Sequence, residues 1–152
     1  MKIKAAEPIS IACPEGGNGP YLPLYVIFTD IPATKAALQN ATRLARDLQA
    51  RLIVVAAQVV PYPLPLDEPP VSGAFTARVL SQLAAEQEAD VEVRVYQCRD
   101  RNVAIRKAIK PESLVMIGSS KRWWPNRTTF LARLLKRDGH RVILTPTPLE
   151  TP

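Results

Sequence analysis

The residues best suited to chemistry follow the predicted strands, where polar side chains come after apolar runs. The candidates for binding a nucleotide or another anionic ligand are Asp30, Gln58, Val59, Gly118, Ser119, Lys121, Thr128 and Thr129. The Asp30 carboxylate can accept hydrogen bonds from a ribose or an adenine amine, and Gly118 lets a ligand approach the backbone. Thr128 and Thr129 offer hydroxyl groups and helix-start N–H groups to an anion. Two of these residues also have a structural interpretation: Asp30 can cap a helix, and Gly118 can ease a tight turn at the exit of a strand.

The sequence contains no convincing catalytic constellation. His140 is the only histidine, and its place in a turn predicts a surface or capping role, so no Ser-His-Asp or Cys-His arrangement is expected. The two cysteines, Cys13 and Cys98, match no metal-ligand spacing, and Cys98 is expected to be a small buried thiol. We therefore expect a protein without a metal site that is not an enzyme, with slow nucleotide hydrolysis as the open alternative.

A basic and aromatic segment lies between Gly118 and the last predicted helix. It contains Lys121, Arg122, Trp123 and Trp124. Its cations suit either a solvated loop or an anion site. Trp123 and Trp124 are candidates for contact with a protein partner or for stacking on a base, because tryptophan is enriched at interfaces.

Length and composition bound the class of protein. The chain has 152 residues, of which 47% are hydrophobic, and this fits one domain with a sizeable core. The net charge of +6 permits anionic partners without choosing among them. Because the basic residues are distributed over several helices and loops, nucleic-acid binding is not expected. The absence of a bilayer-length apolar run and of a secretory signal predicts a cytoplasmic protein without membrane contact.

Five apolar runs alternate with four helical patterns, which predicts an open, mostly parallel sheet with helices on both faces. The third run alternates apolar and polar residues, which indicates an edge strand or one wet face. An irregular arm is expected over residues 1–20, one domain over 21–146 and a Pro-rich tail over 147–152. The predicted strands are Leu24–Phe28, Leu52–Ala57, Val91–Tyr96, Leu114–Ile117 and Val142–Leu144.

The helices are expected to bury one apolar face each. The first is predicted from Ala33 to Ala50, and the second opens at the N-cap Ser72 and ends near Asp90. Asn102 is the expected cap of the short third helix, and Gly139 the expected C-terminal cap of the last. The core residues predicted for the second and last helices are Phe75, Val79, Leu80, Leu83, Phe130, Leu131, Leu134 and Leu135.

Two segments of the chain resemble the universal stress protein family. VIFTD, which ends at Asp30, precedes an Ala/Leu-rich helix, and VMIGSS, which contains Gly118, leads to a helix and then RVILTP. The resemblance covers about Pro23 to Pro146. It implies a Rossmann-like, three-layer α/β/α fold with a five-stranded sheet of order 3-2-1-4-5, dimers, and ATP binding in one branch. The stretch from Trp123 to Leu134 is also similar to stress-protein-like cytosolic domains of some amino-acid permeases.

The ATP-binding branch of that family carries the motif G-2x-G-9x-G-(S/T) after the fourth strand. Gly118 matches the first glycine and Lys121 stands where the second belongs. With the loop shortened by three residues, Thr128 and Thr129 fall on the final pair. Glycines in this motif let main-chain N–H groups wrap the phosphates, and Lys121 can instead supply charge directly.

Two functions remain open from the sequence. One is a non-catalytic regulatory or stress-response module that acts as a homodimer and through a protein partner, with no required cofactor. The other is a protein that binds ATP, AMP or another anionic ligand at a modified phosphate loop from Gly118 to Thr129. The predicted dimer edge is Val142, Ile143 and Leu144, since an edge strand needs covering.

Overall fold

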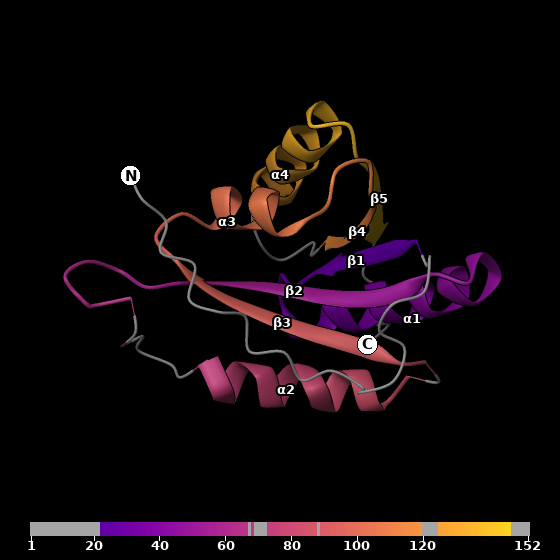
Figure 1. Ribbon diagram of the computed structural model, residues 1–152, viewed down its shortest axis with the longest axis horizontal. Coiled ribbons are helices and arrows are strands. Elements are labelled where there is room, and N and C mark those ends of the chain that lie inside the picture. Colours follow the sequence, from indigo (N-terminus) through magenta and orange to yellow (C-terminus); the bar gives the residue numbers. More distant parts are fainter. Residues whose placement is uncertain (1–21, 67, 69–72, 88, 120–124, 147–152) are drawn as a thin grey trace, which may run out of the picture.

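The computed structural model describes residues 22–66, 68, 73–87, 89–119 and 125–146 (Figure 1). The predicted arm and tail, the N-cap Ser72, and Lys121, Trp123 and Trp124 lie outside the described residues. Strands and helices alternate in the predicted order. The elements are β1 (Pro23–Ile27), α1 (Ile31–Leu48), β2 (Arg51–Val59), α2 (Gly73–Ala85), β3 (Val91–Cys98), α3 (Arg101–Ala108), β4 (Leu114–Ser119), α4 (Pro125–Arg137) and β5 (Arg141–Pro146).

The five strands form one sheet in the order β3-β2-β1-β4-β5, and all neighbouring strands are parallel. This confirms the predicted α/β class and strand order. The central strand β1 has β2 on one side and β4 on the other, so Ile27 is aligned with both Val55 and Ile117. The order therefore reverses beside β1, and in open α/β sheets the crevice at such a reversal binds ligands.

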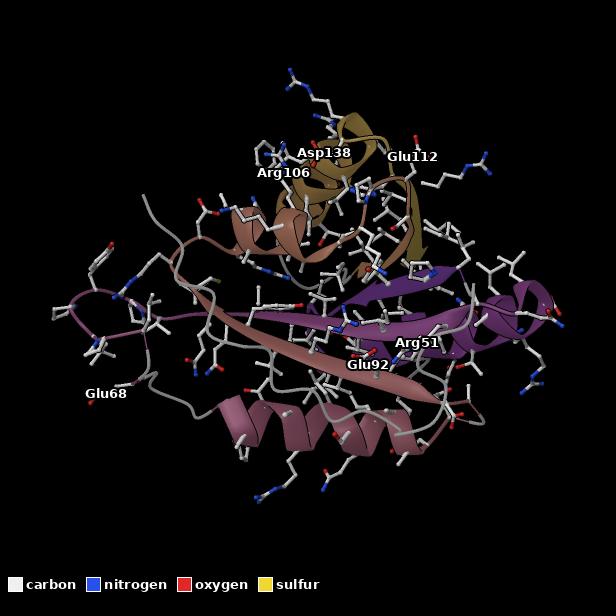
Figure 2. The ribbon with its side chains drawn as sticks, in the orientation of Figure 1. Arg51, Glu68, Glu92, Arg106, Glu112 and Asp138 are labelled. Atoms are coloured by element: carbon white, nitrogen blue, oxygen red, sulfur yellow. The ribbon has the colours of Figure 1, made fainter. Side chains whose placement is uncertain are left out.

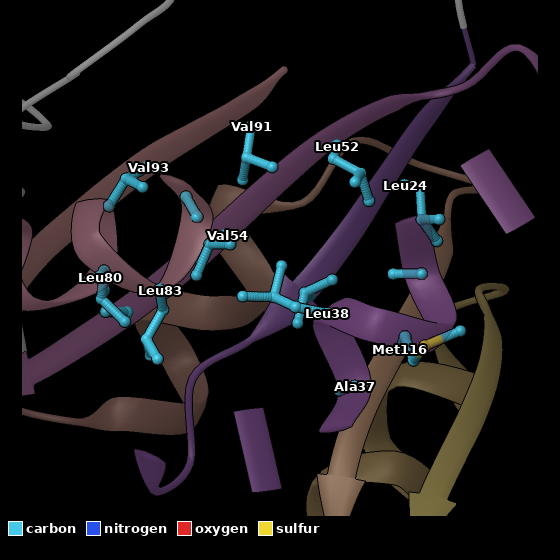
Figure 3. Packing of buried hydrophobic residues seen from close by; sticks show 14 of the residues in the cluster. Leu24, Ala37, Leu38, Leu52, Val54, Leu80, Leu83, Val91, Val93 and Met116 are labelled. Carbon is cyan, nitrogen blue, oxygen red and sulfur yellow. The ribbon is translucent and has the colours of Figure 1, made fainter. Parts of the chain in front are cut away.

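Two helical layers cover the two faces of the sheet. Alternate residues of β1 serve different layers: Leu24 and Val26 pack under α1 and α2, whereas Tyr25 and Ile27 pack under α3 and α4. A strand buried on both faces has to be apolar throughout, which explains the continuous run in the sequence. Figure 3 shows part of the first cluster, in which Leu38 of α1 and Leu80 of α2 lie near Val54.

Caps fix the ends of two helices. Gln49, in the left-handed conformation at φ 52°, ends α1. At the end of α4, Gly139 has φ 97°, its N–H donates to the Lys136 carbonyl at 3.1 Å, and the His140 N–H donates to the Leu135 carbonyl at 3.0 Å. These paired bonds form a Schellman motif, which confirms Gly139 as the C-terminal cap.

The predicted core positions of Phe75 and Phe130 are wrong, because these side chains are 55% and 54% exposed. In α2 the buried stripe follows Ala77, Leu80 and Leu83, and Phe75 lies about two residues off that stripe. A helix turns about 100° per residue, so such an offset moves a side chain to the outer face. In α4 the small residue Ala132 is buried beside Leu131 and Leu135, and Phe130 is turned outward.

Two other predictions need correction. The residue that caps α3 is Asp100, whose carboxylate accepts the Val103 N–H at 3.2 Å, and Asn102 is already inside the helix. Of the two roles predicted for His140, the surface position is wrong, because the residue is buried and its Nδ1 accepts the Ser113 N–H at 3.2 Å. Its backbone N–H does take part in the cap of α4 described above.

The strand β3 lies at the sheet edge, as its alternating pattern predicts. Its polar face is nevertheless not fully wet, because Glu92 is only 8% exposed. The Glu92 carboxylate lies 2.8 Å from Arg51 Nη2 (Figure 2). It also lies 2.9 Å from Arg94 Nε. The positive charges of two arginines therefore offset the cost of burying the Glu92 carboxylate away from water.

Candidate ligand-binding site

A pocket of about 440 Å³ lies at the carboxyl ends of the strands, between the end of β1 and the helices α3 and α4. Its volume is in the usual range for small-molecule sites. It combines a cation, a carboxylate, an amide, two hydroxyl groups and an apolar wall. The lining residues are Thr29, Asp100, Arg101, Asn102, Thr128, Phe130 and Leu131.

Arg101 joins the pocket to the centre of the sheet. It is the first residue of α3, and its Nη2 donates to the Phe28 carbonyl, just past β1, at 2.9 Å. The neighbouring Asp100 is exposed, and one of its carboxylate oxygens accepts a hydrogen bond from the Val103 N–H. The pocket therefore presents a positioned guanidinium next to a carboxylate that already has a partner.

Thr29 ties the two strands at the reversal together. Its hydroxyl donates to the Gly118 carbonyl in β4 at 3.0 Å, and its N–H donates to Thr34 Oγ1 in α1 at 3.2 Å. These bonds hold Thr29, one of the lining residues, in place before any ligand arrives. Such preorganisation lowers the ordering cost of binding.

Asp30 takes the structural role that the sequence left open. Its backbone is extended, and its Oδ1 accepts the Ala33 N–H at 2.8 Å, so the residue is the N-cap of α1. It does not line the pocket. The ligand contact predicted for Asp30 stays a prediction.

Gly118 is required by packing. A Cβ placed on it would overlap the Ala33 carbonyl oxygen and would lie 2.5 Å from the Ala33 carbonyl carbon. The missing side chain therefore lets the first turn of α1 rest directly on β4. The ligand contact predicted for Gly118 is not needed to explain this glycine.

Gln58 and Val59 do not follow the second strand but belong to it, since β2 continues to Val59. In register they pair with Gln97 and Cys98 of β3, beyond the point where β1 ends. The Gln58 carbonyl accepts the Cys98 Sγ–H at 3.6 Å. Neither Gln58 nor Val59 lines the pocket.

Of the candidates on the last helix, only Thr128 lines the pocket. The helix α4 begins at Pro125, so Thr129 has a helical residue four positions before it. With that spacing the Pro125 carbonyl is the intrahelical acceptor for the Thr129 N–H, so the hydroxyl is the group left for a ligand, and the contact predicted for Thr129 stays a prediction. Ser119 is the last residue of β4, and Lys121 lies outside the described residues.

The sequence places Asp100 at this rim, within Gln97 to Asp100, without selecting it as a site residue, and Arg101 and Asn102 are missed although a usable signal is present. They lie two to four positions after the end of β3, and the same rule that selects Asp30 and Gly118 applies to them. Phe130 was missed for a different reason, because it had been assigned to the core.

The thiol of Cys98, which lies next to this site in the sequence, is buried as expected. Cys98 is fully buried, and burial, followed by the Asp100 charge, raises the pKa of its thiol, while Arg101 acts in the opposite direction. The described side chains of His, Cys, Asp and Glu form no group of three that could hold a metal ion. In the described part of the chain, no helix has both the length and the apolarity to cross a membrane.

Comparison with solved structures finds the same architecture over nearly the whole of each neighbour. A universal stress protein from Archaeoglobus fulgidus in complex with dAMP superposes with a TM-score of 0.57 at 17% identity, covering 82% of this chain and 98% of that chain. A protein of the universal stress protein family from Burkholderia pseudomallei gives 0.56 at 19% identity, covering 85% and 99%. This chain has the universal stress protein fold.

A further structure, the universal stress protein from Archaeoglobus fulgidus, gives a TM-score of 0.54 at 16% identity, covering 82% of this chain and 98% of that one. No family model and no curated protein matches the sequence. The universal stress protein fold is thus shared while most residues differ. Function has to be argued from the site of this chain.

Proposed function

We propose that the protein is a non-catalytic regulatory module that binds a small anionic ligand of the nucleotide class in the pocket between α3, α4 and the end of β1. The observation that carries this proposal is a preformed volume of about 440 Å³ at the strand-order reversal with Arg101 in its wall. A guanidinium is well suited to phosphate. A neighbour with the same fold contains dAMP, which supports testing nucleotides first.

The other lining groups suit the remainder of such a ligand. Asn102 and Thr128 offer hydrogen-bonding side chains, and Phe130 and Leu131 provide an apolar wall. The one carboxylate among the lining residues, Asp100, already accepts the Val103 N–H. Capping occupies one oxygen of this carboxylate, and the lining residues include no second carboxylate and no histidine as a candidate base, which favours binding over hydrolysis.

Thermal unfolding with and without AMP, ADP, ATP and cyclic dinucleotides tests the proposal. A ligand at a hundred times its dissociation constant should add about 2.7 kcal/mol to the free energy of unfolding. We expect the ligand-induced shift to be lost in Arg101→Ala and reduced in Asn102→Ala. Asn102→Ala is included because Arg101→Ala also removes the hydrogen bond to the Phe28 carbonyl.

The matched control is Lys107→Gln, which removes a charge from the exposed side of the same helix. It should keep the full ligand-induced shift. If none of the nucleotides shifts the transition in wild-type protein, the nucleotide proposal is wrong. Equal shifts in all four proteins would mean that the ligand binds outside this pocket.

A second candidate activity is dimerisation through β5. This strand forms the free edge of the sheet opposite β3, and its residues Ile143 and Leu144 are 38% and 41% exposed. An exposed apolar edge strand is prone to pair with another chain. Val142 is half-buried against the sheet, so Ile143 and Leu144 are the residues that a second copy would cover.

A further inference from the structure

Positive charge gathers at the end of the molecule opposite the pocket, around the amino ends of β4 and β5. Seven of the cationic side chains that the structure describes occupy this region, here termed the basic pole, and all seven are exposed. Two exposed carboxylates, Glu112 and Asp138, accompany them. The basic pole consists of Arg106, Lys107, Lys110, Arg133, Lys136, Arg137 and Arg141.

Topology brings these residues together although they are far apart in the sequence. Both α3 and α4 run back from the carboxyl ends to the amino ends of the strands, so their last turns finish side by side. Arg106 of α3 reaches Asp138 after α4 with two nitrogen–oxygen distances of 2.7 Å (Figure 2). At the strand level, Leu114 of β4 is aligned with Arg141 of β5.

The opposite helical layer has no comparable excess. The described residues of α1, α2 and the turns after them contain four cations and three carboxylates. One pair, Lys35 and Glu86, lies 3.6 Å apart. The cations of that layer are Lys35, Arg43, Arg46 and Arg78, and the carboxylates are Asp47, Glu86 and Asp90. The charge that looked distributed in the sequence is therefore concentrated on one layer in space.

Helix dipoles explain only part of this concentration. Arg106 and Lys107 lie in the last turn of α3, and Lys136 and Arg137 in the last turn of α4, where a cation interacts favourably with the helix dipole. Arg133 lies one turn earlier, and Arg141 begins a strand. Like charges gathered on one side of a molecule repel each other, and a bound polyanion would relieve that repulsion.

We propose that the basic pole binds the phosphate backbone of a double-helical nucleic acid without reading its sequence. Phosphate contacts from arginine and lysine supply the sequence-independent part of such binding. Asp138 does not oppose it strongly, because Arg106 pairs with its carboxylate. The proposal is independent of the ligand pocket, which lies at the other end of the strands.

The surroundings of the cations favour a duplex over a single strand or a lipid surface. The sequence has no Phe, Tyr or Trp at positions 101–113 or 131–142, so it offers no platform for stacking unpaired bases. Among the described residues of those two ranges, no large apolar side chain is exposed. A membrane-surface site would need such side chains as anchors.

Fluorescence anisotropy with a labelled, mixed-sequence DNA duplex tests the proposal in a series of salt concentrations. We expect weak binding, with a dissociation constant on the order of 10⁻⁴ to 10⁻⁶ M near physiological salt, that tightens steeply as salt is lowered. A second duplex of unrelated sequence should bind equally well. The slope of log K against log salt should be about −0.9 for each phosphate that is neutralised.

Two triple variants separate the basic pole from the net charge of the chain. The first variant replaces Lys107, Lys110 and Lys136 by Gln and so removes three charges from the basic pole. The second replaces Lys35, Arg43 and Arg78 by Gln and removes three charges from the α1–α2 layer. The first triple should weaken binding and flatten the salt slope by about 2.7, at roughly 0.9 per lost phosphate contact. The second should bind like wild type.

Circular dichroism melts would first establish that both triples keep the wild-type fold. Equal binding by the two triples would overturn the proposal, as would a failure of wild-type protein to bind duplex at low salt. Binding to anionic phosphatidylserine vesicles tests the alternative that the basic pole contacts a lipid surface. If the protein binds these vesicles and not the duplex, the pole serves a lipid surface and the nucleic-acid proposal is wrong.

Discussion

Gly118 and Ala33 meet so closely that a single methyl group decides how α1 rests on β4. Because the contact is with the Ala33 backbone, a new side chain at position 118 cannot be accommodated by a change of rotamer. We expect Gly118→Ala to lower the free energy of unfolding by about 1–3 kcal/mol, as overpacking of a core does. Urea denaturation followed by circular dichroism would measure the loss.

The control repeats the substitution in an Ala33→Gly background. Removing the Ala33 methyl group leaves its carbonyl in place, so the cost of Gly118→Ala should stay nearly the same. Full rescue by Ala33→Gly would mean that the side chain, and not the backbone, sets the distance between α1 and β4.

At the scale of elements, the ion pair between Arg106 and Asp138 fastens α3 to the end of α4. The hydrogen bonds from Arg106 lower the pKa of the Asp138 carboxyl below its ordinary value of 3.8. The folded state therefore keeps this carboxylate ionised at a pH where the unfolded chain takes up a proton. The resulting stabilisation is present above pH 3.8 and is lost as the pH falls through the lower folded value.

We expect Asp138→Asn to melt slightly below wild type at neutral pH, because exposed ion pairs contribute little. The difference in melting temperature should shrink to zero under acid conditions, when the wild-type carboxyl is also neutral. Melts of both proteins from neutral pH to below pH 3.8 would follow this convergence. A difference that persists in acid would point to a packing defect of the variant.

The order and type of the elements could be predicted because the burial of each one leaves a periodic pattern. Leu24 to Ile27 are apolar on both faces since helices cover both faces of β1. Exact helix faces were harder to predict. Ala77 and Ala132 carry little apolar surface yet take the buried positions, while the larger Phe75 and Phe130 lie outside. Size alone does not tell which stripe of a helix meets the sheet.

For the whole molecule, the β5 edge predicts a homodimer that a single charge disrupts. Ile143→Lys should give a monomer, because an isologous contact would place the two lysines close together at the interface. The matched control is Leu48→Lys, which changes a similarly exposed apolar residue on α1. Sedimentation velocity would compare the three proteins. A monomeric wild type, or a dimer that survives Ile143→Lys, would contradict the β5 interface.

The sequence located the rim that carries the candidate site but not the pocket itself. Positions after parallel strands share one edge of a sheet, and this rule placed Asp30 and Gly118 near the reversal of strand order. The pocket depends in addition on how α3 and α4 approach each other. Arg101 and Phe130 are twenty-nine positions apart, and only the packed helices bring both into one wall.

The close approach of Ala33 to Gly118 also changes how a family signature should be interpreted. In this chain, the contact with the first turn of α1 accounts for the glycine next to the end of β4, whether or not a phosphate is bound. Its presence is therefore a marker of architecture, and the later glycines of the motif are the informative ones for ligand binding. For this chain, Gly118 by itself is therefore not a sign of nucleotide binding.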